Sequence, residues 1–437
     1  MKLNNIYKLN DKYFFRTGVI LLASAPFISI ILFLMTISIS IYKNKADIFN
    51  DKHNRIFLIS AIGILIISIV HIFTIDNLSI EKVSWDNINN VEKIFKSETS
   101  PFSSLIGTFN WIPLILCFFY FQNYLDSMKE RKIIMKLFVA GTFPVLITGF
   151  GQYWFNWHEP LTFLNGLIIW FQKPIPHLSG LFNNQNYAGC WLNIVWPFSI
   201  AIFLEKKHIF FKKGASIIFM ISILLASLLT SSRNAWGGLF LTLPILLSSS
   251  FSRLLLFIIG IFALLLILFL LNLFSEGFNI LSQINLEEYS NNVDRRSSII
   301  LFAAKMIFKN PILGYGAATF PIYYFLKTAA YKGHTHNLII DLTFNYGIII
   351  SILIFSNIFK ICFESFNKIF LSKLEIYSNN YFERAWWTSF FILLLSQMVD
   401  VQYYDLRISI SFWILLSGLK CIIKEKINRN NNMTYTN

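Results

Sequence analysis

The chain has 437 residues, of which 55% are hydrophobic, 17% aromatic and 14% charged. This composition excludes an ordinary soluble domain and predicts a polytopic membrane protein. The formal net charge of +14 would favour nucleic acid as the partner of a soluble protein, but here the lysines and arginines gather in short segments between apolar runs, as in cytoplasmic loops beside anionic lipid.

A series of apolar runs predicts the membrane spans, because each run is near the ~20 residues that a helix needs to cross a bilayer core. Continuous apolar runs, without the alternation of barrel strands, favour helices. We therefore expect an all-α polytopic membrane protein of about 11 or 12 transmembrane helices. The runs lie at residues 17–42, 56–75, 103–124, 135–155, 187–204, 215–232, 235–250, 254–274, 338–361, 386–400 and 407–423.

The N-terminal run, 17–42, leaves two alternatives open. It follows a basic segment without a small-residue cleavage site, so we expect no cleaved signal peptide. At ~1.5 Å per residue the run is ~39 Å long, too short for two full crossings. Either Pro26 marks a hairpin of two tilted half-length helices, or the N-terminus lies outside against the charge rule. We favour the hairpin.

The loop charges give an orientation. Basic segments, expected in the cytoplasm, are Lys43–Arg55, Lys129–Lys136, Glu205–Lys213, Lys360–Arg384 and Lys420–Arg429. With one crossing per span, the acidic segment Asp76–Pro101 and the segments 156–186, 231–234, 275–337 and 401–406 all fall on the outer face. This places one large loop, 275–337, outside.

Two outer segments carry further expectations. Segment 156–186 reads as a loop with an interfacial apolar piece around Leu161–Phe171. In the large loop, Ser297–Phe308 has apolar residues at helical spacing, followed by Pro311 and Gly314. We expect a short amphipathic helix on the membrane surface there.

Polar residues at the ends of the apolar runs are the candidates for chemistry. Arg233 follows a long apolar run, where an arginine should face water or an anion. Arg295 and Arg296 offer guanidinium forks suited to a phosphate or diphosphate. His336, followed by Asn337, opens the span at 338–361, and imidazole exchanges a proton near neutral pH. The topology brings Arg233, Arg296 and His336 to one face, which predicts an anion site with a potential base.

Other chemistries find less support. His334 and His336 are two residues apart, which is the wrong spacing for a helical metal pair, and no carboxylate near them in the sequence completes a ligand set. We expect no metal. Neither a Walker loop nor a dinucleotide fingerprint occurs, and GYGAA at Gly314–Ala318 reads as a turn. The four cysteines form no CxxC pair and read as packing residues. We expect no cofactor.

Four motifs, in this order and spacing, resemble the O-antigen ligase and polymerase superfamily of bacterial envelope enzymes. They are GLFNNQNYAG at Gly180–Gly189, TSSRNAW at Thr230–Trp236, the run Arg296–Gly316 with KNPILGYG, and THNLIIDLTFNYGI at Thr335–Ile348. The family often has an aromatic residue where this chain has Ile300. Its common acidic residue is Asn345 here, although Asp341, one helical turn earlier, supplies a carboxylate.

The resemblance implies a fold of the lipid-carrier (GT-C-like) glycosyltransferase type. It also implies transfer of a glycan from a polyprenyl diphosphate carrier to a hydroxyl of lipid A core or another glycan acceptor. Carried over, His336, Arg296 and Arg233 would be catalytic, and Arg295, Asn337, Asn186 and His334 would bind substrate. We divide the chain into N-terminal helices, 1–186, and a ligase-like membrane domain, 187–437. The implied location is the bacterial inner membrane, with the active site facing the periplasm and no nucleic acid as partner.

Two alternatives remain at this point. The same residues would serve a polymerase of O-antigen or exopolysaccharide repeat units. A transporter for an anion such as bicarbonate, or for a sugar, would instead show inverted repeats and paired helix breaks near the bilayer midplane, and we find no convincing internal repeat in the sequence.

Overall fold

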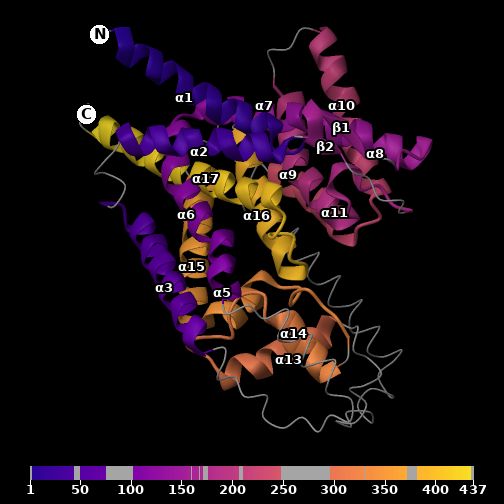
Figure 1. Cartoon of the computed structure of the whole chain (residues 1–437). Coiled ribbons are helices and arrows are strands. Elements are labelled where there is room, and N and C mark those ends of the chain that lie inside the picture. Colours follow the sequence, from indigo (N-terminus) through magenta and orange to yellow (C-terminus); the bar gives the residue numbers. More distant parts are fainter. Residues whose placement is uncertain are drawn as a thin grey trace.

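The computed structural model describes residues 2–43, 50–74, 102–158, 160–166, 168–170, 176–205, 210–247, 296–328, 330–371 and 381–434. These parts are mostly helical (Figure 1), which confirms the helical membrane fold. Six helical stretches among them are long and apolar enough to cross a membrane: Pro26–Lys43, Lys52–Phe73, Ser103–Tyr124, Met128–Phe155, Leu338–Phe370 and Leu406–Glu425. The total of 11 or 12 stays a prediction, since the expected span 254–274 lies outside the described residues.

The N-terminal apolar run forms a helical hairpin, α1 (Lys2–Leu21) and α2 (Pro26–Lys43). Proline lacks a backbone N–H and fits the first turn of a helix, so α2 begins at Pro26. The Ser29 hydroxyl donates to the Gly18 carbonyl at 2.7 Å and fastens the two helices together. The predicted break is confirmed, but the half-length helices were wrong: α1 and α2 have 20 and 18 residues, because α1 already starts within the polar N-terminal segment.

The next helices run through α3 (Lys52–Thr74), α5 (Ser103–Gly107), η3 (Thr108–Asn110), α6 (Ile112–Phe121), η4 (Gln122–Tyr124), α7 (Met128–Gly141) and α8 (Phe143–Phe155). The predicted span 135–155 is thus two helices, and α7 starts inside the segment expected as a basic loop. Ser127 caps α7 by accepting the Glu130 N–H at 3.4 Å. The first turns of α7 thus contain charged residues that the sequence analysis placed in a loop.

Arg131 explains how α7 tolerates that charge. Its side chain is 1% exposed and donates to Glu383 at 3.2 Å and to Glu425 at 2.6 Å. A buried guanidinium is costly unless it is paired and hydrogen-bonded. These two ion pairs join α7 to the first turn of α16 (Tyr381–Val399) and to α17 (Leu406–Thr434).

The segments predicted as cytoplasmic lie together at one end of the molecule. Lys12 and Arg16 form ion pairs with Glu130 at 3.0 and 2.7 Å. The basic N-terminal segment therefore lies at this same end, as the hairpin alternative requires. Further ion pairs between these segments join Lys420 to Asp51, Lys52 to Glu364, and Lys132 and Lys136 to Glu205. Both chain termini lie on this side, at the upper left of Figure 1.

Segment 156–186 contains the only two strands among the described residues. Strands β1 (Leu161–Phe163) and β2 (Ile168–Trp170) pair antiparallel, with Leu161 opposite Trp170. Between them lies η5 (Leu164–Gly166), where Leu164 and Asn165 have positive φ angles. The Trp170 indole donates to the Ser24 carbonyl at 2.8 Å. The expected apolar piece is therefore a small hairpin tied to the α1–α2 turn.

The second half of the chain forms the centre of the bundle. After η6 (Gly180–Phe182) come α9 (Gln185–Phe203), α10 (Phe210–Leu229), α11 (Arg233–Leu247), α13 (Arg296–Lys309), α14 (Phe320–Thr328), α15 (Leu338–Phe370), α16 (Tyr381–Val399) and α17 (Leu406–Thr434). The indoles of Trp191, Trp386 and Trp413 are fully buried in one large apolar core. Helices α9 and α16 pack side by side at its centre (Figure 1).

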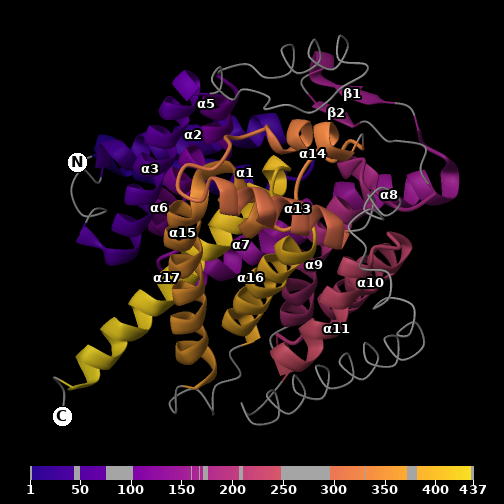
Figure 2. The same cartoon turned by 90° about the horizontal axis from the view of Figure 1, so that it is seen from below.

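Helix α13 confirms the amphipathic helix predicted at Ser297–Phe308. Its buried residues Ile299, Ala303 and Ile307 recur at helical spacing. They form a separate cluster with Phe320 and Tyr324 of α14. In Figure 1 these two helices lie at the lower end of the molecule, and in Figure 2 they lie across the helical bundle. Arg295 and residues 275–294 of the large loop lie outside the described residues.

The chain after α13 docks into a break in α15, which the sequence predicted as one uninterrupted span. Gly347 leaves the helical conformation with φ +82°. The backbone N–H groups of Tyr315 and Gly316 donate to the carbonyls of Phe344 and Asn345 at 2.8 and 3.0 Å. Gly314, with φ +70°, makes the turn expected at GYGAA. The KNPILGYG and NYG motifs therefore fit each other and hold α13 and α14 against α15.

Replacing Gly347 by alanine should destabilise the protein by more than about 3 kcal/mol. A Cβ atom there would lie 1.9 Å from the Ile312 carbonyl oxygen, and the positive φ disfavours any side chain. Thermal unfolding of the purified protein in detergent measures the change. Gly214→Ala is the matched control, since its Cβ meets nothing within 4 Å, and it should be neutral or slightly stabilising. Equal melting temperatures for the two variants would contradict this account.

Candidate functional site

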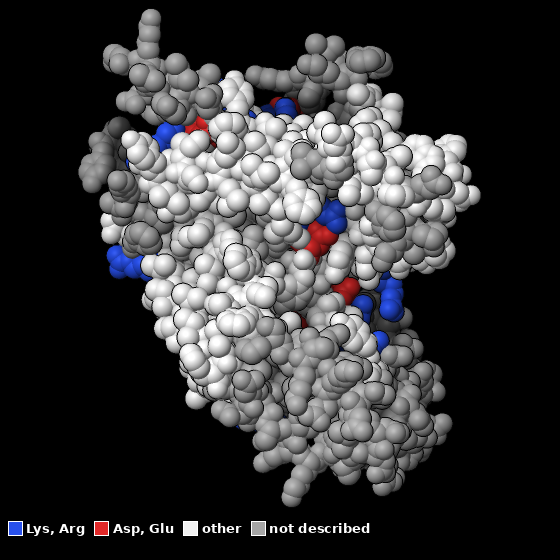
Figure 3. All heavy atoms as spheres, viewed as in Figure 1, with Lys and Arg blue, Asp and Glu red and all other residues white. Residues whose placement is uncertain are grey.

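An open cavity of about 470 Å³ lies between the N-terminal ends of α9, α11 and α13 and the last turns of α16. Its polar lining residues are Gln185, Asn186, Ser231, Ser232, Arg233, Asn234, Arg296, Ser396 and Asp400. Leu241, Ile392 and Leu395 line its apolar part. In Figure 3 blue and red groups gather around a hollow at the centre right, on a face whose other described residues are largely uncharged. The cavity therefore offers a charged mouth and an apolar side.

Arg233 and Arg296 both line this cavity, from the first residues of α11 and α13. Both side chains are exposed to solvent. Within the described part of the chain, neither forms an ion pair with a carboxylate. Two arginines that share one cavity suit an anion with several oxygens, such as a diphosphate.

The starts of α9 and α11 add to the positive character of the cavity. Asn184 caps α9 by accepting the N–H groups of Asn186 and Tyr187 at 2.8 and 3.4 Å. The α10–α11 turn bends through Ser231, with φ +54°, and Thr230 accepts the Ser232 N–H at 3.2 Å. Helix N-termini carry partial positive charge. The backbone at these helix starts therefore adds partial positive charge to that of the two arginines.

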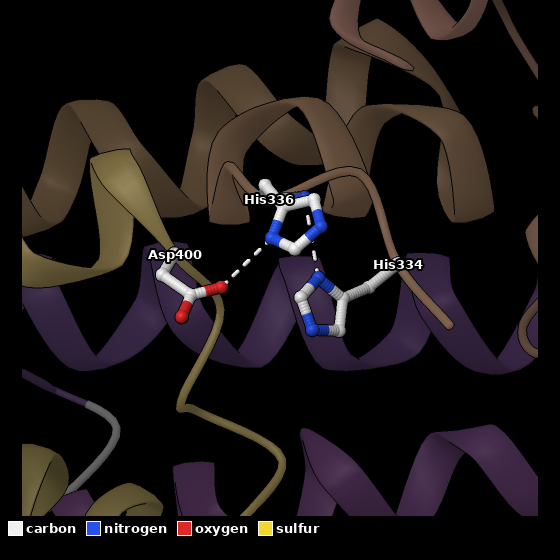
Figure 4. Close-up of side chains that lie close together, drawn as sticks. All are labelled: His334, His336 and Asp400. Carbon is white, nitrogen blue, oxygen red and sulfur yellow. Dashed lines mark hydrogen bonds and ion pairs between the residues drawn. The ribbon is translucent and has the colours of Figure 1, made fainter. Parts of the chain in front are cut away.

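His336 lies beside this cavity and is paired with Asp400, one of its lining residues (Figure 4). The distance between His336 Nδ1 and Asp400 Oδ1 is 2.8 Å. Asn186 donates its amide to Asp400 Oδ2 at 3.3 Å and accepts the Ser232 hydroxyl at 2.9 Å. These contacts link the histidine turn before α15 to the beginnings of α9 and α11.

Asp400 is held ionised in this arrangement. Burial by itself would raise the pKa of the carboxyl group. The hydrogen bond with His336, the positive charge that the rings of His334 and His336 carry when protonated, and the charge of Arg296 more than offset burial, so the pKa lies below its ordinary value. An ionised carboxylate only accepts hydrogen bonds, so His336 Nδ1 carries the proton of this bond. In the neutral form of the ring, Nε2 is then the nitrogen with the lone pair.

The turn that presents His336 is strained and well supported. His336 has φ +58°, a left-handed conformation that is unfavourable for a side chain of this size. Its N–H donates to His334 Nδ1 at 3.2 Å. Burial, together with the neighbouring His336 ring, lowers the pKa of His334, which favours the neutral ring needed to accept this bond. Asn337 caps α15, because its side-chain oxygen accepts the Ile339 N–H, and its side-chain amide donates to the Met398 carbonyl at 2.9 Å.

His334, His336 and Asp400 could also hold a metal ion, since each offers a ligand atom and these atoms lie within 4.8 Å of one another. Two imidazoles and a carboxylate suit zinc. Both Nδ1 atoms, however, take part in the hydrogen bonds just described. The argument that no carboxylate accompanies the histidines was wrong, because Asp400 comes close in space. The expectation of no metal stays a prediction.

The structure brings together nearly all of the residues predicted for the site. Asn186, Arg233 and Arg296 line one cavity, and His334, His336 and Asn337 form the adjacent turn. Arg295 lies outside the described residues. The sequence reasoning missed Asp400 and Ser232. The signal for Asp400 was available: it is an acidic residue at the end of the span 386–400, on the same predicted face as His336.

Comparison with known families supports the resemblance seen in the motifs. No curated protein matches the chain. The family described as O-antigen ligase matches residues 216–355, a segment that includes Arg233, Arg296 and His336 but neither Asn186 nor Asp400. Residues 216–355 thus match the O-antigen ligase family, and this match supports membership of the chain in the O-antigen ligase superfamily.

Proposed function

We propose that this protein transfers a glycan from a polyprenyl diphosphate carrier to an acceptor sugar hydroxyl at the outer face of the bacterial inner membrane. The observation that carries the proposal is the cavity that holds both arginines and shares Asp400 with His336. This arrangement supports an anion site with a proton acceptor beside it. The O-antigen ligase family supports the general activity.

The donor diphosphate would bind at Arg233 and Arg296. The apolar residues Leu241, Ile392 and Leu395 continue the cavity away from the arginines, which suits the start of a lipid chain. As the glycosidic bond breaks, negative charge grows on the diphosphate, and the preset guanidinium groups stabilise it. A diphosphate is a good leaving group, so the scheme requires neither a general acid nor a nucleotide or metal.

His336 would act as the general base. Asp400 fixes the proton on Nδ1, so Nε2 can accept the proton of the acceptor hydroxyl. The hydroxyl oxygen attacks the anomeric carbon, a new carbon–oxygen bond forms, and the bond to the diphosphate oxygen breaks. Polyprenyl diphosphate leaves with the electron pair, and direct displacement inverts the anomeric centre. Paired carboxylates of the glycosidase type are not needed.

Asp400→Asn should lower the turnover number by about 10²-fold or more, of the order that general base catalysis contributes. The amide can donate to Nδ1 and so move the histidine proton to Nε2, which removes the base. Initial rates of transfer with purified protein and lipid-linked glycan measure the effect. Asp405→Asn is the control, because Asp405 lies in the same segment and pairs with Arg407. A wild-type rate for Asp400→Asn would contradict the role.

Envelope polysaccharide profiling tests the proposed function itself. A strain lacking the protein is complemented with wild type, Arg296→Ala, His336→Ala or the control Arg55→Ala, at matched protein levels. Arg55 is exposed and lies at the opposite end of the molecule, where it contacts the Asn50 carbonyl. We expect wild type and Arg55→Ala to restore long chains on the acceptor, and the two site variants to accumulate lipid-linked glycan.

The pattern of products separates the alternatives. Loss of long chains from the acceptor, with accumulation of lipid-linked polymer, indicates a ligase. Single repeat units in place of polymer indicate a polymerase. An unchanged profile in the deletion strain, or full rescue by both site variants, would overturn the catalytic proposal and favour transport.

A further inference from the structure

Asp341, which the site described so far does not use, is a buried carboxylate in the first turn of α15. It is 3% exposed, and both of its oxygens accept hydrogen bonds. Oδ1 accepts the backbone N–H of Thr335 at 3.1 Å. Oδ2 accepts the hydroxyl of Tyr404 and, at 3.3 Å, the side-chain amide of Asn345. A carboxylate is stable in such a place only when its oxygens are occupied in this way.

The two oxygens of Asp341 reach the two segments that form the site. Thr335 immediately precedes His336, whose left-handed backbone needs support from its neighbours. Tyr404 belongs to the short segment 400–405 that carries Asp400 between α16 and α17. One side chain therefore fastens both partners of the His336–Asp400 pair.

Tyr404 is suited to donate to this carboxylate. Burial of its hydroxyl and the neighbouring Asp341 charge raise the pKa of Tyr404 well above its ordinary value, so the hydroxyl stays protonated. Among the described residues, the side-chain hydrogen bonds of Asp341 and Tyr404 go to Thr335, to Asn345 and to each other. The two residues would thus act on the reaction through the segments that carry His336 and Asp400.

We infer that Asp341 and Tyr404 are positioning residues that hold His336 and Asp400 at hydrogen-bonding distance for the transfer reaction. The inference rests on the proposed function. Displacement of a catalytic group by about 1 Å can cost about 10²-fold in rate. The contacts of Asp341 would therefore affect the turnover number and leave the binding of the donor unchanged.

The experiment compares Tyr404→Phe with Tyr403→Phe in the purified full chain. The neighbouring Tyr403 hydroxyl also has two hydrogen bonds, to the Asn110 carbonyl at 3.0 Å and from the Trp413 indole at 2.8 Å, and neither of these bonds is with Asp341. At equal amounts of folded protein, we expect Tyr404→Phe to lower kcat about 10- to 100-fold with the donor KM unchanged within about twofold. Tyr403→Phe should keep the wild-type kcat.

Asp341 variants and a double variant give two further readouts. Asp341→Asn keeps an acceptor for Thr335 and should be less impaired than Asp341→Ala, which loses both contacts. Adding Tyr404→Phe to Asp400→Asn should cause little further loss, because residues that act through one pair are not additive. A merely structural role predicts instead that the two losses multiply.

The outcomes distinguish this inference from the proposed function. Wild-type kcat in both Tyr404→Phe and Asp341→Asn, while His336→Ala is inactive, would overturn the inference alone. So would multiplicative losses in the double variant. Absence of transfer by the wild-type protein, or full transfer by His336→Ala, would overturn the proposed function and the positioning roles with it.

Discussion

Replacing His336 with glutamine should lower the turnover number for glycan transfer by about 10²- to 10⁴-fold, the range that general acid–base catalysis contributes. Glutamine retains a side chain that can hydrogen-bond to Asp400, but it cannot accept a proton at neutral pH. The attacking hydroxyl would then have to lose its proton to water as it reaches the anomeric carbon. The protein with its lipid-linked donor in detergent provides the assay.

Donor binding is the companion measurement. Arg233 and Arg296 lie on α11 and α13, outside the turn that carries His336, so the affinity for polyprenyl diphosphate should stay within about twofold of wild type. A change confined to kcat indicates an interaction made only in the transition state. His53→Gln is the control for the same substitution, because His53 bonds to Asn357 at the opposite end of the molecule. If His336→Gln weakened donor binding and left kcat intact, the base role would be wrong.

The sequence predicted the helices well because lipid leaves the backbone few choices. The amphipathic helix at Ser297–Phe308 and the break at Pro26 depend on local patterns, and both are present as α13 and the α1–α2 hairpin. The predicted start of the span at residue 135 was wrong, since α7 begins at Met128, and the reason lies in contacts between distant parts of the chain. Arg131 finds Glu383 and Glu425 at sequence separations of 252 and 294 residues, and no local charge rule anticipates partners that far away.

The break in α15 was missed for the same kind of reason. Phe344 and Asn345 give their carbonyls to the 311–316 turn rather than to the continuing helix. The glycine at 347 was visible in the sequence, but glycine alone does not distinguish a helix break from close packing. The partner turn, which supplies the competing donors, decides the outcome.

The site was partly predictable because charge patterning determines which ends of the spans share a face. Arg233, Arg296 and His336 could be assembled from that argument, and the structure places the two arginines around one cavity and the histidine beside it. Asp400 was missed because it ends an apolar run 64 residues after His336, where no motif marks it. Face assignment predicts which residues can meet, whereas hydrogen bonds between individual side chains depend on helix packing.

Replacing Arg296 with alanine should reduce kcat for transfer by about 10²- to 10³-fold, equivalent to roughly 3 to 4 kcal/mol of transition-state stabilisation. The guanidinium lies at the start of α13, exposed to the cavity, where in the proposed mechanism charge would develop on the departing diphosphate. Arg296→Lys should restore less than about a tenth of the wild-type rate, because a point charge does not reproduce the two-donor fork. Lys309→Ala, at the other end of α13, is the control for a lost positive charge on the same helix.

A comparison of donors makes this prediction specific to the diphosphate. The binding of polyprenyl monophosphate should be weakened less by Arg296→Ala than the binding of polyprenyl diphosphate, because the second phosphate supplies the oxygens that occupy both guanidinium groups. Arg233→Ala should show the same discrimination, since both arginines line the same cavity. If Arg296→Ala weakened both lipids equally and Arg296→Lys restored full activity, Arg296 would contribute only general attraction for anions. Catalysis would then depend on His336 and Arg233.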